Sequence, residues 1–301
     1  MANNIINSFL FKISSKKYIA AVSGGPDSMA MLNMFKHKIK TVAFVNYKKR
    51  IESDYEEQIV KEFCEENNII FFAYTVDWKK ENEKINNFQA HARKIRYDFF
   101  CKVAIQTSNN NLLVAHNFND FLETGYAQIE RNSRSLYYGI LQESMYRNLK
   151  IFRPLLFVEK KYLEDYCINN KVKYSIDYTN SSDDYERNRN RKIILGMKPE
   201  EYQFLVKRIF NYNKANKDKL KKVTKYFYNW EISNYDISFF KKIPNDLWFN
   251  IVYLLLINNH LGKISSNKIN GIIDFISKNS SKEYRVTSKV NISIKNSKLS
   301  F

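Results

Sequence analysis

The chain has 301 residues, of which 44% are apolar and 27% are charged. A chain of this length and composition builds about two domains around buried cores, which excludes a disordered or collagen-like protein. Its three separated cysteines exclude a disulfide scaffold and favour reduced thiols in a cytoplasmic protein. Lys and Arg exceed Asp and Glu by 18, which favours a nucleic-acid partner, although an AT-rich genome would produce part of this excess. The N-terminus lacks a signal-peptide pattern, and no apolar run is long enough to span a membrane, so we expect no membrane association.

Strands and helices are expected to alternate through the first half of the chain. Apolar runs predict four strands, at 16–23, 41–47, 69–76 and 111–116, of which the first is expected to be buried. Helices are expected after them, at 27–35, 53–66, 87–107 and 119–129. Continuous apolar strands that alternate with helices are typical of a parallel sheet with helices on both faces. We therefore expect an α/β, Rossmann-like fold.

The second half of the chain is organised differently. Residues 131–150 are expected to form mostly loops, and a helix is expected near 159–169. After about residue 195 the alternation stops, and residues 196–301 hold 19 Lys and Arg against 8 Asp and Glu. We therefore predict a catalytic domain over 1–195 and a smaller, mainly helical, basic accessory domain over 196–301.

The turn Ser23-Gly24-Gly25-Pro26-Asp27-Ser28 lies between the first strand and its helix, where doubly wound sheets bind nucleotides. Glycines let the backbone curve around an anion, the helix N-terminus offers N–H groups, and the serine hydroxyls add donors. Asp27 would repel a phosphate directly, so we expect it to hold Mg²⁺ that bridges to the phosphates. The spacing fits neither a Walker A loop nor a dinucleotide fingerprint. The alternative is an ordinary turn with an Asp helix cap.

A second polar group follows the fourth predicted strand, at the same edge of the sheet as this turn. His116 ends the strand, and Asp120 and Glu123 lie three residues apart, which places both carboxylates on one face of the next helix. Two carboxylates there would hold a cation, either Mg²⁺ or the ammonium group of an amine. The alternative is that they only complement the helix dipole.

Two sets of arginines are candidates for anion binding. Arg93 and Arg96 lie three apart on a predicted helix and could face the same phosphate. Arg187, Arg189 and Arg191 would crowd the first turn of a helix that starts near 187, where the dipole disfavours cations. A contact with a nucleotide or RNA phosphate would offset that cost. The alternatives are a solvated helix face for Arg93 and Arg96, and an irregular, exposed basic loop for the second set.

Separated segments of the chain together resemble the tRNA(Ile)-lysidine synthetase family of PP-loop ATP pyrophosphatases. The turn at 23–28 is similar to the SGGxDS loop of that family, and His116, Asp120, Glu123 and Thr124 match its HxxxDxxET pattern. Three further segments match it, at 92–97 (ARKIRY), 153–156 (RPLL) and 177–191 (DYTN to YERNRNR). The resemblance covers about residues 17–195. Many members have His and Asp where this chain has Asn117 and Asn119, and a Gly-rich stretch where it has 131–134. The remaining tail is too short for both C-terminal domains of the longest members, so we expect one.

This resemblance implies a ligase that uses ATP, Mg²⁺, free lysine and the tRNA(Ile) whose anticodon is CAU. ATP adenylates the carbonyl oxygen at carbon 2 of the wobble cytidine, and the lysine ε-amine then displaces AMP, which changes the codon read from AUG to AUA. The roles that it implies are ATP binding by the turn 23–28, Arg93 and Arg96, catalysis by Asp27, His116, Asp120 and Glu123, lysine binding by Asp120 and Glu123, and tRNA or phosphate binding by Arg187, Arg189 and Arg191. The basic tail is expected to contact tRNA.

Two other functions remain open from the sequence. Another PP-loop activity, such as that of a tRNA thiolase or an NAD or GMP synthetase, would share the turn at 23–28. Sulfur transfer usually needs paired cysteines, however, whereas Cys64, Cys101 and Cys167 are isolated, and a small-molecule synthetase has no need for the basic tail. The second alternative is an RNA-binding protein with a vestigial loop, which the intact turn beside a matching His/Asp/Glu set disfavours.

Overall fold

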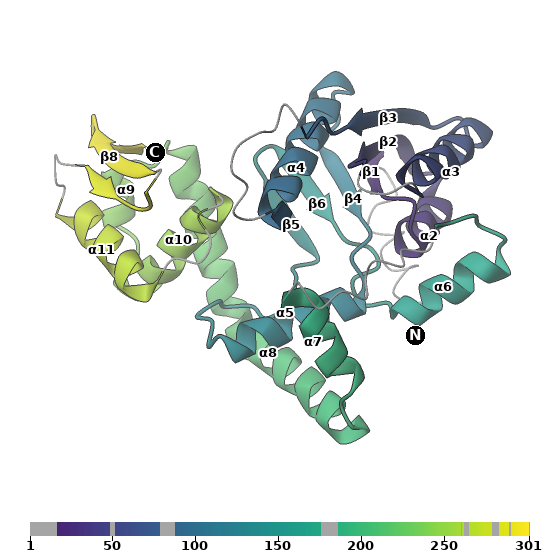
Figure 1. The fold of residues 1–301 in the computed structure, drawn as a ribbon. Coiled ribbons are helices and arrows are strands. Elements are labelled where there is room, and N and C mark those ends of the chain that lie inside the picture. The colour runs from purple at the N-terminus through teal and green to yellow at the C-terminus, as the bar shows by residue number, and fades with distance from the viewer. Residues whose placement is uncertain are drawn as a thin grey trace. The chain divides into compact units, whose positions relative to one another are not determined.

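The computed structural model describes residues 17–48, 52–78, 88–175, 186–259, 261, 265–278, 283–288 and 290–300. They form two compact units, whose elements are labelled in Figure 1. The first unit contains the described residues up to Arg131 and from Gly139 to Val206, and the second contains Asn132–Tyr138 and the described residues from Lys207 onward. Residues 196–206 therefore pack with the first unit. The assignment of catalytic and accessory functions to 1–195 and 196–301 stays a prediction.

A six-stranded, mostly parallel sheet forms the centre of the first unit, in the order β3-β2-β1-β4-β6-β5. The strands are β1 (Tyr18–Val22), β2 (Ile39–Asn46), β3 (Ile70–Thr75), β4 (Asn111–Val114), β5 (Glu143–Tyr146) and β6 (Leu149–Phe152). The first five in spatial order run parallel, and β5 pairs antiparallel with β6 at the edge. The predicted α/β fold is confirmed.

The β5–β6 hairpin differs from the prediction that 131–150 would form mostly loops. Its tight turn lies at Arg147, which adopts a positive φ of 49°. Such turns usually contain Gly or Asn-Gly, because those residues tolerate a positive φ. Since neither is present at this turn, the sequence lacks the usual indication of a hairpin.

Helices cover both faces of the sheet, as predicted. One face packs against α2 (Pro26–Phe35), α3 (Glu52–Glu66) and α6 (Lys160–Asn169), and the other against α4 (Phe88–Gln106). Side chains along β1 alternate between the two faces. Tyr18 and Ala20 belong to the core on the side of α2, α3 and α6, and Ile19 belongs to the core on the side of α4. Both faces of the central strands β1, β2 and β4 are mostly buried, so these strands appear in the sequence as continuous apolar runs. The edge strand β3 is also apolar, but its residues are partly or fully exposed.

The sheet order places the two predicted site segments next to each other. β1 lies between β2 and β4, so the chain leaves β1 toward one side for β2 and later returns to its other side as β4. Ligands bind in doubly wound sheets at such a reversal, outside the carboxyl ends of the strands. The turn after β1 and the start of α5 (Phe118–Glu130), which follows β4, lie there. Helix α7 (Glu186–Leu195) packs beside α5.

The second unit is mainly helical, as predicted, with a small sheet that the sequence did not indicate. Its helices are the C-terminal part of α8 (Pro199–Ile232), α9 (Ile237–Lys241), α10 (Asn245–Asn258) and α11 (Ser266–Ser277). Its antiparallel strands are β7 (Tyr284–Arg285), β8 (Asn291–Lys295) and β9 (Lys298–Ser300). Trp230, Phe240 and Ile251 lie at the centre of its core. No described helix is both long and apolar enough to cross a membrane.

Candidate active site

The turn between β1 and α2 has a shape that only glycine allows at its second position. Gly24 adopts a φ of +82°, and a Cβ built there would lie 2.9 Å from the Cβ of Glu56. A side chain would therefore suffer both an unfavourable φ and a clash with α3. Gly25 has ordinary extended geometry and space for a Cβ, with the nearest atom 3.8 Å away. The backbone curvature of the turn thus depends on Gly24 much more than on Gly25.

Hydrogen bonds inside the turn keep this curvature. The buried Ser28 hydroxyl donates to the Gly25 carbonyl oxygen at 2.9 Å, and the Ser23 amide donates to Ser28 Oγ at 3.2 Å. The Ser23 hydroxyl is exposed and lies 3.3 Å from Ser28 Oγ. Gly25 is the N-cap of α2 and supplies no side-chain acceptor to the first turn of the helix. The turn is therefore arranged to present backbone N–H groups and the Ser23 hydroxyl to an anion.

Asp27 lies in the first turn of α2 and is largely buried. Its Oδ2 accepts a hydrogen bond from Asn117 Nδ2 at 3.1 Å, and its Oδ1 is buried with no hydrogen-bond partner in the described part of the chain. Burial, with the nearby Asp120 carboxylate, raises the pKa of Asp27 to about 6, against the opposing effects of the Lys160 ammonium and the Asn117 amide. A buried carboxylate oxygen without a partner fits a cation or a ligand group that completes the site.

Magnesium fits this arrangement as an ion that arrives with a nucleotide. Mg²⁺ is usually held by one or two carboxylates together with substrate phosphates and water. Asp27 offers one such oxygen, and among the described residues no three His, Cys, Asp or Glu side chains are grouped as metal ligands. The protein alone therefore provides part of a magnesium site, and the role of Asp27 as a metal ligand stays a prediction.

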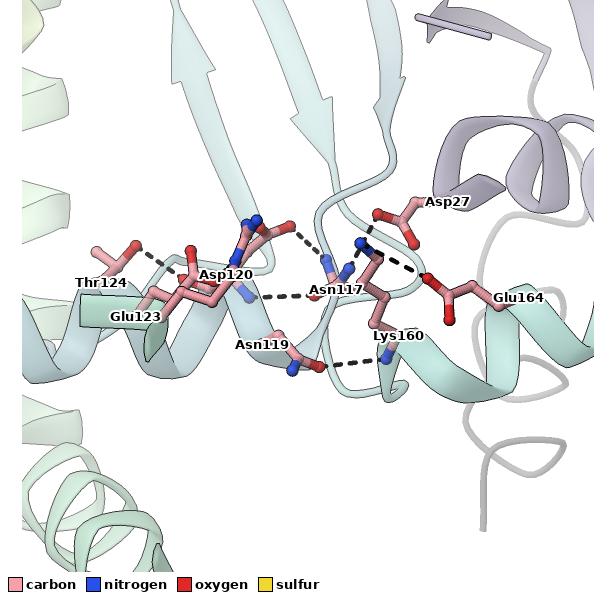
Figure 2. Close-up of polar contacts among 9 residues, drawn as sticks. Asp27, Asn117, Asn119, Asp120, Glu123, Thr124, Lys160 and Glu164 are labelled. Atoms are coloured by element: carbon pink, nitrogen blue, oxygen red, sulfur yellow. Dashed lines mark hydrogen bonds and ion pairs between the residues drawn. The ribbon is translucent and has the colours of Figure 1, made fainter. Parts of the chain in front are cut away.

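The N-terminus of α5 is closed by a reciprocal pair of hydrogen bonds. Asn117 Oδ1 accepts from the Asp120 amide at 3.1 Å, and Asp120 Oδ2 accepts from the Asn117 amide at 2.9 Å. This is a capping box with Asp at the third position, and both side chains are buried. Figure 2 shows how Asn117 contacts Asp120 on one side and Asp27 on the other. Asp120 thus caps the N-terminus of α5, and its role in lysine binding stays a prediction.

Glu123 lies one helical turn after Asp120, with only 3% of its surface exposed. Its Oε1 accepts from Arg191 Nε at 2.6 Å, so α5 and α7 are joined by a charge-assisted hydrogen bond. One of the three arginines predicted to contact an anion therefore pairs with a predicted lysine-binding carboxylate. Arg189 is exposed on α7, and the side chain of Arg187 lies outside the described part.

His116 contacts a buried arginine, Arg153. Its Nδ1 accepts from Arg153 Nε at 3.0 Å, and Arg153 Nη1 donates to the Leu141 carbonyl and to Ser144 Oγ at 2.8 and 2.9 Å. Because guanidinium groups only donate, the neutral imidazole carries its proton on Nε2. His116 is thus held as a hydrogen-bond donor, which suits contact with a phosphate oxygen more than the acceptance of a proton.

Arg93 and Arg96 are exposed on α4 and lie against aromatic rings. The Arg93 guanidinium lies 4.6 Å from the centre of the Tyr97 ring. Arg96 Nε donates to the Tyr47 hydroxyl at 2.9 Å. Their described contacts do not bring them to Asp27, and their predicted role in ATP binding is not tested. The matched segment 177–185 lies outside the described residues.

Residues that the sequence analysis missed complete the site around Asp27. Lys160, the first residue of α6, donates its backbone N–H to Asn119 Oδ1 at 3.2 Å, and its ammonium lies 3.6 Å from Glu164 Oε1. Asn117 could have been found from the sequence, because Asn followed three residues later by Asp is a capping pattern. The contacts of Lys160 with Asn119 and of Arg153 with His116 could not, because these partners lie 41 and 37 residues away in the sequence.

The chain is similar to known proteins along nearly its whole length. Residues 2–197 match the model of the PP-loop domain family. The tRNA(Ile)-lysidine synthase of Ureaplasma parvum serovar 3 is 42% identical over 300 residues, which cover 98% of this chain and 89% of that protein. Proteins of the same name from Malacoplasma penetrans and Mycoplasma pneumoniae are 40% and 34% identical, each over 94% of this chain, and the matches cover 97% and 96% of those proteins.

A solved structure shares the fold at low sequence identity. The U34-tRNA thiolase NcsA from Methanococcus maripaludis, determined with its 4Fe-4S cluster, superposes with a TM-score of 0.59 at 15% identity. The match covers 71% of this chain and 79% of the thiolase. At this identity the likeness concerns the fold alone.

Proposed function

The chain belongs to the tRNA(Ile)-lysidine synthase family, and we propose that it joins free lysine to carbon 2 of the wobble cytidine in the CAU anticodon of tRNA(Ile). Three relatives of that name match 94–98% of this chain, whereas the PP-loop domain accounts for residues 2–197. The similarity therefore extends into the second unit. The reaction makes the protein an ATP-dependent ligase that forms a carbon–nitrogen bond, and the modified tRNA then reads AUA in place of AUG.

One contact supports this reaction more than any other. Adenylation and amine attack must take place at the same cytidine, so the groups that perform them must lie together. Asp27, in the turn assigned to ATP, accepts a hydrogen bond from Asn117, which begins the helix that carries Asp120 and Glu123. The two halves of the proposed chemistry thus meet at one edge of the sheet (Figure 2).

The first step of the proposed reaction is adenylation. The O2 oxygen of the cytidine attacks the α-phosphorus of ATP, and the bond from that phosphorus to the bridging oxygen breaks to release pyrophosphate. We assign the phosphates to the turn 23–28, where the Ser23 hydroxyl and the N-terminus of α2 supply donors. His116 adds a donor at the adjacent strand end. Asp27 would hold Mg²⁺, which offsets negative charge on the phosphates.

The second step is substitution by lysine. The ε-amine attacks carbon 2, the bond from carbon 2 to the adenylated oxygen breaks, and AMP and a proton are released. We assign the ammonium and amine groups of lysine to Asp120 and Glu123. Because Glu123 is buried and already pairs with Arg191, the incoming lysine must share this carboxylate with the guanidinium or displace it. Arg191 therefore orients the Glu123 carboxylate before lysine arrives.

The basic face of α8 is our candidate for tRNA contact. One side of this helix is buried: Val223 and Phe227 belong to the core of the second unit, and Ile209 is also buried. The opposite side exposes five lysines over about 27 Å of helix, at 207, 214, 217, 221 and 225. Lysines three and four residues apart repel one another and weaken an isolated helix. Contact with a phosphate backbone would offset this repulsion and contribute to the binding of tRNA.

The thiolase alternative is less well supported. The buried Cys64 thiol has its pKa raised to about 12 by burial, and burial also raises the pKa of Cys167 to about 11. Thiols of this kind stay protonated at neutral pH and are poor nucleophiles for sulfur transfer. The lysidine synthases also match the chain at 34–42% identity, whereas the thiolase matches it at 15%.

A direct assay tests the proposal. The protein is incubated with ATP, labelled lysine and a tRNA(Ile) transcript that bears the CAU anticodon, and label in RNA is scored. We expect incorporation that requires ATP, with tRNA(Met), whose anticodon is also CAU, as the control that stays unlabelled. No label in either RNA, in the presence of ATP and Mg²⁺, would contradict the proposal. We place this reaction in the cytoplasm, where tRNA, lysine and ATP meet.

A further inference from the structure

Lys160 lies beside the proposed phosphate site, although it is remote in sequence from the turn 23–28. It is the first residue of α6, and its backbone N–H donates to Asn119 Oδ1 at 3.2 Å, which ties it to the start of α5. Figure 2 shows its side chain extending from α6 so that the ammonium lies among Asn117, Asp27 and Glu164. The ammonium is 3.6 Å from Glu164 Oε1, and 38% of the side chain remains exposed. It can therefore reach a ligand without breaking the fold.

The position of this cation is unfavourable for the helix that carries it. The first turn of a helix has the positive end of the dipole, and a cation there costs about 0.3–1 kcal/mol. Glu164 follows Lys160 by four residues, which is the weaker order for a helical ion pair. The N-cap Glu159 makes no side-chain cap hydrogen bond that would compensate. Helix stability thus gives no reason for a lysine at this place.

The chemistry of the turn 23–28 supplies a reason. The turn contains no lysine or arginine, and its one charged residue is Asp27. Phosphate loops of the Walker type carry a lysine that reaches the β- and γ-phosphates. Here the charge of Lys160 acts on Asp27 and opposes the effect of burial on the pKa of that carboxyl. A polyphosphate bound at the turn would meet the Lys160 ammonium as its counter-charge.

We propose that Lys160 binds the polyphosphate of ATP and stabilises the departing pyrophosphate during adenylation, an inference that rests on the proposed function. As the bond between the α-phosphorus and the bridging oxygen breaks, its electron pair passes to that oxygen, which leaves on pyrophosphate. The Lys160 ammonium donates a hydrogen bond to the leaving group and keeps its proton. Glu164 orients the ammonium and is released when the phosphates arrive.

The experiment compares Lys160→Met with Lys161→Met, its exposed neighbour on α6, in the full chain. Pyrophosphate release from ATP in the presence of tRNA is measured, together with tRNA affinity and the thermal midpoint. We expect Lys160→Met to slow release by about 10²–10³-fold, the usual effect of losing one charge-stabilising donor. Lys161→Met should stay within about twofold, and tRNA affinity and the thermal midpoint should be unchanged in both. Equal rates in the two variants would overturn the inference.

Two further variants separate catalysis from a structural ion pair. Lys160→Arg keeps the charge and should restore part of the rate. Glu164→Gln removes the charged partner of Lys160 and should slow pyrophosphate release only a few fold. A loss equal to that of Lys160→Met would mean that the ion pair itself determines the rate, and would overturn the inference.

If the unaltered protein releases pyrophosphate but incorporates no lysine, the proposed function fails while the role of Lys160 is still measured by pyrophosphate release. If lysine is incorporated but Lys160→Met matches Lys161→Met, only the role of Lys160 fails.

Discussion

Asn117 Nδ2 donates a hydrogen bond to Asp27 Oδ2 at 3.1 Å, and this contact joins the turn after β1 to the helix after β4. The two segments are 90 residues apart in the chain. They meet because β1 and β4 are neighbours in the sheet, where the strand order reverses. Asn117 also forms the capping box with Asp120, so one side chain fixes both the α5 terminus and the Asp27 carboxylate. The position of the proposed metal ligand therefore depends on the same residue that begins the proposed lysine-binding helix.

The turn itself should respond differently to two neighbouring substitutions. Gly24→Ala forces a positive φ on a residue with a Cβ and creates a clash with Glu56, which costs on the order of 1–3 kcal/mol. Gly25→Ala has room for its Cβ and serves as the matched control. We expect a lower thermal midpoint and loss of pyrophosphate release in Gly24→Ala, with Gly25→Ala folded close to normal. Similar midpoints in both variants would show that the turn is not constrained at Gly24.

Asp27→Asn should separate chemistry from RNA binding. An Asn side chain can still accept from Asn117, so the fold is kept, but the carboxylate proposed to hold Mg²⁺ is lost. We expect pyrophosphate release to stop while tRNA affinity, measured by gel shift on the same preparation, stays near normal. Equal loss of both activities would indicate that the turn serves RNA binding or that the variant is misfolded.

The same substitution should change the pH dependence of unfolding, measured without ATP and with a chelator. The pKa of Asp27 is raised from 3.8 to about 6, so between these values the folded state binds more protons than the unfolded state. The free energy of unfolding therefore falls as pH rises through this window, and the loss is complete above about pH 6. Asn has no such titration. Relative to the unaltered chain, Asp27→Asn should gain on the order of 2 kcal/mol between about pH 4 and 7. Asp165→Asn, at an exposed position, should show no such gain, and a flat difference for Asp27→Asn would contradict the burial of its charge.

Much of the fold could be predicted, because each buried strand is a continuous apolar run followed by a helix. The β5–β6 hairpin was missed since Arg147 adopts a positive φ without glycine. In the site, the rule that parallel strands end at one edge of a sheet predicted that the turn 23–28 and the carboxylates Asp120 and Glu123 lie at the same edge. The hydrogen-bond partners of these side chains could not be predicted. Arg191 pairs with Glu123 and Arg153 with His116, and each pair joins segments that are far apart in the sequence and meet only in the folded chain.

Glu123→Gln tests the assignment of the lysine site. The neutral amide keeps the shape of Glu123 but weakens its attraction for the lysine ammonium and for Arg191. We expect adenylation to continue, seen as pyrophosphate release, while the lysine KM rises at least about tenfold. Glu130→Gln, at the exposed end of the same helix, is the control. An unchanged lysine KM in both Glu123→Gln and Asp120→Asn would leave these carboxylates with a purely structural role.

The lysines of α8 should set the salt dependence of tRNA binding. Truncation is a poor test, because Tyr138 exchanges two hydrogen bonds with Asn213 and would lose its partner. Changing Lys214, Lys217, Lys221 and Lys225 to Gln removes only charge. Each lost phosphate contact lowers the slope of log K against log salt concentration by about 0.7–0.9. The control changes four exposed lysines of the first unit, at 40, 61, 102 and 171. Equal slopes in the two variants would place the tRNA elsewhere.

The central claim is that this chain makes lysidine at the wobble position, and the mass of that nucleoside tests it most directly. A tRNA(Ile) transcript with a CAU anticodon is incubated with the protein, ATP, Mg²⁺ and lysine, then digested to nucleosides and analysed by mass spectrometry. Our account predicts one cytidine per tRNA heavier by one lysine less one water, absent when ATP or lysine is omitted or when Asp27→Asn is used. A wobble cytidine of unchanged mass, or one that carries sulfur, would contradict it.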